Sequence, residues 1–385
     1  MTALQTGHSR GFLGESEPIG PTGVPNEREL LLLVGLSLVV TWATLFFLHQ
    51  SPAVALSYGD NGAYLDVARA ILHWDFHNVQ LQHFMGYPYF IAATSLVFRV
   101  PPGLALWLIA AGCSVLSAWL TARLFGTTVA QYFALTNFSW LQLSWLGGSE
   151  PLAMALALGS WLAFRRNRPV IAVLLGSLAV TVRPLMFFLL VGVGLVLLYR
   201  RRFAAFASAL GIGLGIGALY TWPLAHYFGD PLFTVHSYTT RDYGGAGVAG
   251  PHGRLFGWPF HAIVAETMAY PAPWTNLLLS FFWIALVLLG IGMMFRDRFR
   301  RFARTYPNEV IFCGLYLLAV FSYDYLIWAR SNFIRFSIPA LPFVFFALLP
   351  FLPRDRRVIW GLTVVSAILA AISAIGLSNV MRIIH

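Results

Sequence analysis

The sequence predicts an all-α protein, a polytopic bundle of about eleven transmembrane helices, within a range of about 10–12. Hydrophobic residues make up 58% of the 385 residues and charged residues only 10%, whereas soluble domains carry about 25% charged residues. Apolar runs of membrane-spanning length recur along the chain, and no soluble domain of any size fits between them. We therefore expect a disordered, Gly/Pro-rich cytoplasmic tail over residues 1–29 and a single transmembrane domain over residues 30–385.

The first span is expected over residues 30–48, and a polar, His-rich outer loop follows over residues 50–86. Within that loop, apolar residues from Tyr64 to Leu72 recur at helical spacing, which is typical of an amphipathic helix lying at the membrane surface. The apolar segment 87–98 is too short to cross comfortably. We expect it to enter the membrane and return, because the alternation of the loops between the two faces then works; a full span is the alternative that stays open. The other spans are expected at 104–124, 129–146, 152–164, 170–182, 185–199, 205–227, 276–295, 310–328, 334–351 and 358–378.

Arginine clusters indicate which loops between the expected spans lie on the cytoplasmic side. The net charge is +10, and the arginines gather between spans at 165–168, 200–202, 296–304 and 354–357. The positive-inside rule places these clusters in the cytoplasm. Topology therefore explains most of the positive charge, and we expect no nucleic-acid partner. The loops 50–86 and 228–274 then fall on the outer face.

Ionisable residues outside the arginine clusters gather at the outer boundary. Asp60 follows the first span and stands between Gly59 and Asn61-Gly62. A carboxylate at a membrane boundary must be hydrated or paired, which makes it a functional candidate; the alternative is a cap on the surface helix. Glu150 precedes Pro151 at the start of a span, and its alternative role is a favourable charge at a helix N-terminus.

Three arginines lie on the face where arginine should be scarce. Arg183 precedes Pro184 at a turn between two spans, and its alternative role is that of an interfacial side chain reaching water. Arg330 and Arg335 flank Ser331-Asn332, and such a pair could grip a phosphate at head-group level. The alternative for this pair is the binding of ordinary lipid phosphate.

The outer loop 228–274 is rich in aromatic residues and carries His236, Asp242 and a glycine run at 244–247. Aromatic faces with fixed polar groups suit sugar binding, so this loop could form a mobile lid over a substrate. The sequence contains no metal-ligand spacing, phosphate loop or nucleophile elbow. Cys113 and Cys313 lie in apolar stretches and indicate neither a disulfide framework nor a metal site.

Six short motifs follow one another along the chain. They are Gly59-Asp60-Asn61-Gly62-Ala63-Tyr64, Gly86-Tyr87-Pro88, Ser149-Glu150-Pro151-Leu152, Thr181-Val182-Arg183-Pro184, Gly229-Asp230-Pro231-Leu232-Phe233, and Arg335-Phe336 followed by Pro339-Ala340-Leu341-Pro342. In their order and spacing they resemble the GT-C superfamily of integral membrane glycosyltransferases, and most closely the GPI-mannosyltransferases of the PIG-V kind and their bacterial relatives. In the family, Tyr often stands where this chain has Phe336.

The resemblance implies a multi-pass protein of the inner or plasma membrane with its active site on the non-cytoplasmic face. It implies inverting transfer of a sugar such as mannose from a polyprenyl-phosphate donor to a lipid, glycan or protein acceptor. Asp60 would be the essential base. We assign Glu150, Tyr64, His236 and Asp242 to acceptor orientation, and Arg183, Arg330 and Arg335 to the donor phosphate.

These residues require no cofactor. A divalent cation could bind beside Asp60, but the sequence contains no set of ligands that requires one. Two other functions stay open at the level of sequence. One is a transporter or lipid flippase, although its usual internal repeat and mid-span charges are not evident. The other is a non-catalytic subunit that kept the GT-C-like fold and lost the activity.

Overall fold

The computed structural model describes residues 27–47, 60–76, 84–240, 242–243, 246–247, 256–258, 292, 297–322, 335–353, 355, 357–368 and 370. Over these residues the chain is all-α, as the sequence predicts. A two-residue antiparallel ladder, β1 (Asp242–Tyr243) with β2 (Ala246–Gly247), is the strand pairing found in this part of the chain.

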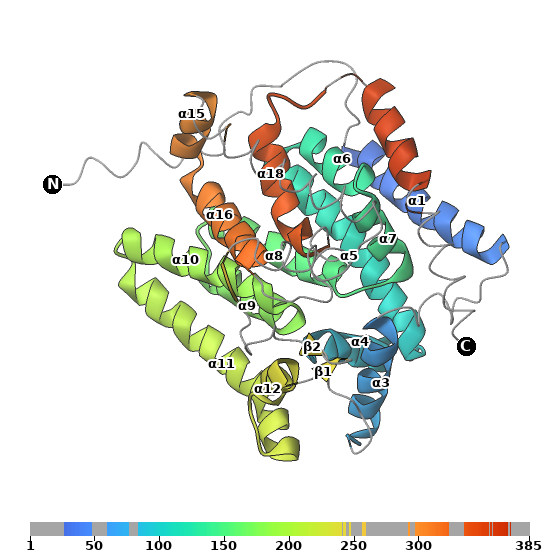
Figure 1. Cartoon of the computed structure of the whole chain (residues 1–385), viewed down its shortest axis with the longest axis vertical. Helices are drawn as coiled ribbons and strands as arrows, with labels where there is room; N and C mark the ends of the chain where they lie inside the picture. Colours follow the sequence, from blue (N-terminus) through green and yellow to red (C-terminus); the bar gives the residue numbers. More distant parts are fainter. Residues whose placement is uncertain are drawn as a thin grey trace.

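Most helices coincide with apolar runs of the sequence, and Figure 1 shows their arrangement. In chain order they are α1 (Glu27–Phe47), α3 (Asp60–His73), α4 (Gly86–Phe98), α5 (Pro102–Phe125), α6 (Thr127–Leu135), α7 (Phe138–Leu146), α8 (Glu150–Arg165), α9 (Pro169–Val182), η1 (Pro184–Met186), α10 (Phe187–Tyr199), α11 (Phe203–Phe228), α12 (Phe233–Thr240), α15 (Asp297–Thr305), α16 (Pro307–Ser322), η2 (Ile338–Ala340) and α18 (Leu341–Leu348). A further apolar helix spans Arg357–Ile368.

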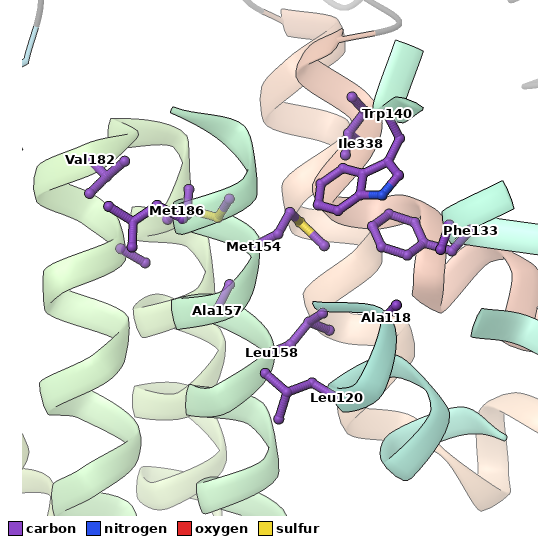
Figure 2. Close-up of a cluster of buried hydrophobic side chains, with 14 of the residues drawn as sticks. Ala118, Leu120, Phe133, Trp140, Met154, Ala157, Leu158, Val182, Met186 and Ile338 are labelled. Carbon is purple, nitrogen blue, oxygen red and sulfur yellow. The ribbon is translucent and has the colours of Figure 1, made fainter. Parts of the chain in front are cut away.

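Helix α8 lies at the centre of the packed core. It is apolar nearly all round, which is the pattern of a helix covered on every side. Met154 and Leu158 lie between Met186 on one side and Leu120 of α5 on the other (Figure 2). Ser160 faces α9 and donates a hydrogen bond to the carbonyl of Ala172 at 2.6 Å. The middle of this buried helix is therefore packed against α5 on one side and bonded to α9 on the other.

Two of the described helices are long and apolar enough to cross a membrane. They are α5 and α11, with mean hydropathies of 1.8 and 1.7 over their most apolar stretches. Leu214 and Leu219 of α11 are 65% and 78% exposed, and water is a poor solvent for such a surface. The other apolar helices described are 10–17 residues long. The total of about eleven spans thus stays a prediction.

The expected span 129–146 is wrong as a single helix, because it is divided into α6 and α7. The break falls at Thr136-Asn137, where the Asn137 side chain accepts a hydrogen bond from the backbone N–H of Trp140 at 3.2 Å. Asparagine is a favoured helix N-cap, and this bond satisfies one of the donors left over at a helix start. The sequence-based prediction missed this N-cap because apolar residues continue on both sides of Asn137.

Other boundaries also differ from expectation. Helix α1 begins at Glu27, inside the predicted tail, and residues 1–26 lie outside the described part. The expected span 334–351 contains the short 3₁₀ turn η2, where Pro339 and Pro342 remove backbone donors. Helix α15 lies within a predicted arginine cluster. The expected span 276–295 lies outside the described residues except for position 292.

The segment predicted to enter the membrane and return forms the 13-residue helix α4. Its first residue, Gly86, is packed directly against the end of α9. A Cβ atom at this position would lie 2.3 Å from the backbone carbonyl of Thr181, a distance that real Cβ atoms do not reach. Two of the short motifs, Gly86-Tyr87-Pro88 and Thr181 to Pro184, are therefore in contact.

Candidate active site

Glu150 is the first residue of α8 and is only 1% exposed. Its Oε1 atom accepts a hydrogen bond from Nη1 of Arg183 at 2.5 Å. The same oxygen accepts a second, short hydrogen bond from Nε of Arg335. Arg183 caps the end of α9, and Arg335 begins the helical segment before η2. One carboxylate thus joins the consecutive helices α8 and α9 to a segment 185 residues further along the chain.

Asp60 is the first residue of α3, and it completes this charged cluster. Its Oδ2 atom lies 3.0 Å from Nη1 of Arg335, so Arg335 bridges the two carboxylates. The Asp60 side chain is 36% exposed and that of Arg335 is 24% exposed. Asp60 therefore stands at the accessible edge of a cluster whose centre is Glu150.

The turn before α8 places Glu150 by close packing. Gly147 has a φ of +84°, and a Cβ there would lie 2.3 Å from Cδ2 of Leu106. Only glycine fits this backbone comfortably, because it adopts positive φ without a steric penalty. The Asn61 side chain donates to the carbonyl of Leu146 at 3.0 Å. This bond ties the start of α3, and with it Asp60, to the same turn.

Neutral side chains complete the surroundings of the arginines. Ser149 Oγ accepts a hydrogen bond from Arg183 Nη1 at 3.0 Å and lies 3.4 Å from the Tyr64 hydroxyl. The Tyr64 ring packs edge-on against Tyr87, with centroids 5.1 Å apart. The Arg183 guanidinium lies 5.5 Å from the centre of the Phe336 ring. Phe336 can therefore stabilise the Arg183 cation through a cation–π contact with its ring face, which needs no tyrosine hydroxyl.

Tyr64 can donate a hydrogen bond here but cannot act as a base at neutral pH. Burial, together with the neighbouring Asp60 carboxylate, raises the pKa of Tyr64 to about 12. Its phenol therefore stays protonated under ordinary conditions. Asp60 and Glu150 are the carboxylates of the cluster, and of these two Asp60 is the accessible one.

A second buried ion pair lies at the opposite end of α8. Arg165 Nη2 lies 2.6 Å from Glu309 Oε1, and Arg165 Nη1 donates to the carbonyl of Leu124 at 2.6 Å. Trp161 Nε1 also donates to the same Glu309 oxygen at 3.3 Å. The rise of an α-helix separates Glu150 from Arg165 by about 22 Å. This second pair holds α5, α8 and α16 together.

Of the three other predicted site residues, His236, Asp242 and Arg330, only the side chain of His236 is described. His236 is exposed on α12, with Nδ1 2.7 Å from Oδ2 of Asp230. The hydrogen bond from His236 lowers the pKa of Asp230. Asp242 is described only through its backbone, which pairs with Gly247. Arg330 lies outside the described residues.

The structure adds four site residues that had no predicted role. Asn61 and Ser149 lie inside the short motifs quoted above, but nothing in the local sequence showed their partners. Tyr87 and Phe336 enter through ring contacts, which no motif specifies. Within the described part of the chain, no group of three or more His, Cys, Asp or Glu side chains is arranged to hold a metal ion.

Comparison of the chain with protein-family models, with curated proteins and with solved structures found no match.

Proposed function

We propose that this chain is a multi-pass membrane glycosyltransferase, which moves a monosaccharide such as mannose from a polyprenyl-phosphate donor to a lipid, glycan or protein hydroxyl on the non-cytoplasmic face. The observation that carries the proposal is the ionic cluster of Asp60, Glu150, Arg183 and Arg335. Each of the four comes from a different motif of the GT-C resemblance. The cluster brings together the groups that such a transfer needs, namely carboxylates for a hydroxyl and guanidiniums for a phosphate.

The membrane setting is supported by the apolar surface of the chain. Helices α5 and α11 have spanning length, and α11 exposes large apolar side chains along it. The arginines of the connections at 165–168 and 200–202 lie at the ends of α8 and α10 remote from Glu150 and Arg183. Under the positive-inside rule, this arrangement supports an outer location for the Glu150 cluster.

The proposed reaction is a single displacement at the anomeric carbon of the donor sugar. The acceptor hydroxyl oxygen forms a bond to that carbon as its proton passes to a carboxylate oxygen of Asp60. The bond from the carbon to the phosphate oxygen breaks, and its electron pair stays on the phosphate. Configuration inverts because attack and departure occur on opposite faces. Asp60 then loses the proton to water.

The two kinds of charge have separate roles in this scheme. A positioned general base contributes about a hundredfold to ten-thousandfold to the rate, and the accessible Asp60 carboxylate fills that role. Arg183 and Arg335 stabilise the charge that grows on the leaving phosphate, joined by Arg330 on the basis of the sequence. Glu150 holds both described guanidiniums at fixed positions. Tyr64 is assigned to the acceptor, and the buried Ser149 helps to hold Arg183.

The test is a substrate panel on purified protein in detergent or nanodiscs. Polyprenyl-phosphate sugars that differ in the sugar are incubated with acceptor lipids, and release of polyprenyl phosphate is measured with formation of a glycosylated product. We expect one donor to be consumed, and Arg335→Ala to abolish its consumption. If the intact donor is transported across the bilayer and no product forms, the protein is a flippase and not a glycosyltransferase.

A further inference from the structure

Among the described side chains of the candidate site, the charges of the cluster balance. Asp60 and Glu150 provide two negative charges, and Arg183 and Arg335 provide two positive charges. A balanced cluster offers little attraction to an additional anion, because each guanidinium already faces a carboxylate at hydrogen-bonding distance. A phosphate that uses the Nη1 group of Arg335 that now faces Asp60 must therefore take the place of that carboxylate.

The two carboxylates differ in how firmly they are held. Glu150 is buried, and its Oε1 atom accepts from both arginines. Separating it from them would leave an uncompensated charge in the interior, which is strongly unfavourable. The Asp60 side chain is 36% exposed and meets Arg335 at 3.0 Å. Water can solvate Asp60 when that ion pair opens, so Asp60 is the carboxylate that can be exchanged.

We propose that a monoanionic phosphodiester binds by replacing Asp60 on Arg335, an inference that rests on the proposed function. With Asp60 displaced, Glu150 and the two arginines carry one net positive charge, which a single phosphodiester charge balances. The Nη1 atom of Arg335 that now lies 3.0 Å from Asp60 becomes a donor to a phosphate oxygen. The Nε atom of Arg335 keeps its hydrogen bond to Glu150.

The exchange would couple donor binding to activation of the acceptor. In the described state, one Asp60 oxygen is committed to Arg335. An oxygen in an ion pair is a poorer proton acceptor, because the neighbouring cation stabilises its charged form. When the phosphate takes over Arg335, that oxygen becomes available to the acceptor hydroxyl. Substrates should therefore bind in order, with the donor first.

The experiment measures binding of a probe that cannot react. Farnesyl methyl phosphate is a monoanionic phosphodiester without a sugar, so its affinity reports on the phosphate site alone. We would titrate it by calorimetry into detergent-purified wild-type protein and into Asp60→Asn and Asp60→Ala variants. Asp66→Asn is the matched control, because Asp66 lies on the same helix, is exposed and pairs with Arg69. Thermal unfolding confirms that each variant is folded.

We expect both Asp60 variants to bind the probe more tightly than wild type, by about fivefold, since a partly exposed competing ion pair has been removed. Asp66→Asn should leave the affinity unchanged, and Arg335→Ala should weaken it by about tenfold or more. If the probe binds wild type through Arg335 but binds the Asp60 variants no more tightly, the replacement of Asp60 by phosphate is refuted. The assignment of Arg335 to the phosphate would still hold in that case. No binding by any folded variant would overturn both the exchange and the proposed function.

Discussion

Glu150 and Arg335 are separated by 185 residues in the sequence, and Nε of Arg335 donates a hydrogen bond to Oε1 of Glu150. The same oxygen accepts a hydrogen bond from Arg183. Through this one carboxylate, the start of α8, the end of α9 and the segment before α18 meet at a single point. The stability of the fold and the geometry of the candidate site thus depend on the same group.

Replacing Glu150 with Ala should destabilise the protein strongly. Two guanidiniums would lose their shared counter-charge in a buried place, and breaking such a pair typically costs about 3–5 kcal/mol. We expect a clear fall in the midpoint of thermal unfolding in detergent. The exposed Asp66→Ala variant serves as control and should change stability by about 0.5 kcal/mol or less. A Glu150→Ala variant as stable as this control would show that the described ion pairs do not form.

Gly86→Ala should destabilise the contact between α4 and α9. The added Cβ would meet the backbone of Thr181 at 2.3 Å, and overpacking of this kind costs about 1–3 kcal/mol. Gly103→Ala is the matched control, since Gly103 also lies in the first turn of a helix and has open space around it. The control should be neutral or slightly stabilising. Equal unfolding temperatures for the two variants would contradict the close approach.

The Arg165–Glu309 pair should affect stability without affecting donor binding. A double-mutant cycle with Arg165→Ala and Glu309→Gln should show a coupling of about 0.5–3 kcal/mol in the free energy of unfolding. Arg165 lies at the end of α8 remote from Glu150, and Glu309 of α16 pairs with it there. The affinity for a phosphodiester, measured on the folded single variants, should therefore equal that of wild type. A large loss of affinity would mean that the two ends of α8 are not independent.

Residues at the two ends of the helices should be labelled from opposite sides of the membrane. Cysteines introduced at His73 and Arg201, in a protein whose Cys113 and Cys313 have been replaced by Ser, test this directly. Both introduced positions are exposed. In right-side-out vesicles an impermeant maleimide should label His73→Cys and leave Arg201→Cys unmodified until the vesicles are opened. Labelling of both from one side would refute the proposed topology.

The sequence predicts helices well where an apolar run has sharp ends. The expected span 170–182 corresponds closely to α9 (Pro169–Val182), because Pro169 and the Arg183-Pro184 pair mark its two boundaries. It predicts poorly where a polar residue inside an apolar run acts as a cap. Asn137 divides a long run into α6 and α7 through one hydrogen bond to the backbone, and hydropathy does not register such a bond.

The candidate site could be predicted in part. Asp60, Glu150, Arg183 and Arg335 are conspicuous as rare charges near one boundary, and the structure brings these four together. Their pairing could not be read from the sequence, because nothing local encodes contacts between residues 33 or 185 positions apart. Glu309 shows the same limit. It lies beside an arginine cluster in the sequence, and its partner is Arg165, 144 residues earlier.

The central claim is that Asp60 accepts the proton of the acceptor hydroxyl. The most direct test is the single-turnover rate of sugar transfer by Asp60→Asn, with Asp66→Asn as control, at saturating concentrations of the donor identified by the panel. The Asn side chain keeps the size of the residue and removes the base. We predict a rate at least about 100-fold below wild type for Asp60→Asn, with the donor still bound, and an unchanged rate for Asp66→Asn. Transfer by Asp60→Asn at the wild-type rate would contradict the claim.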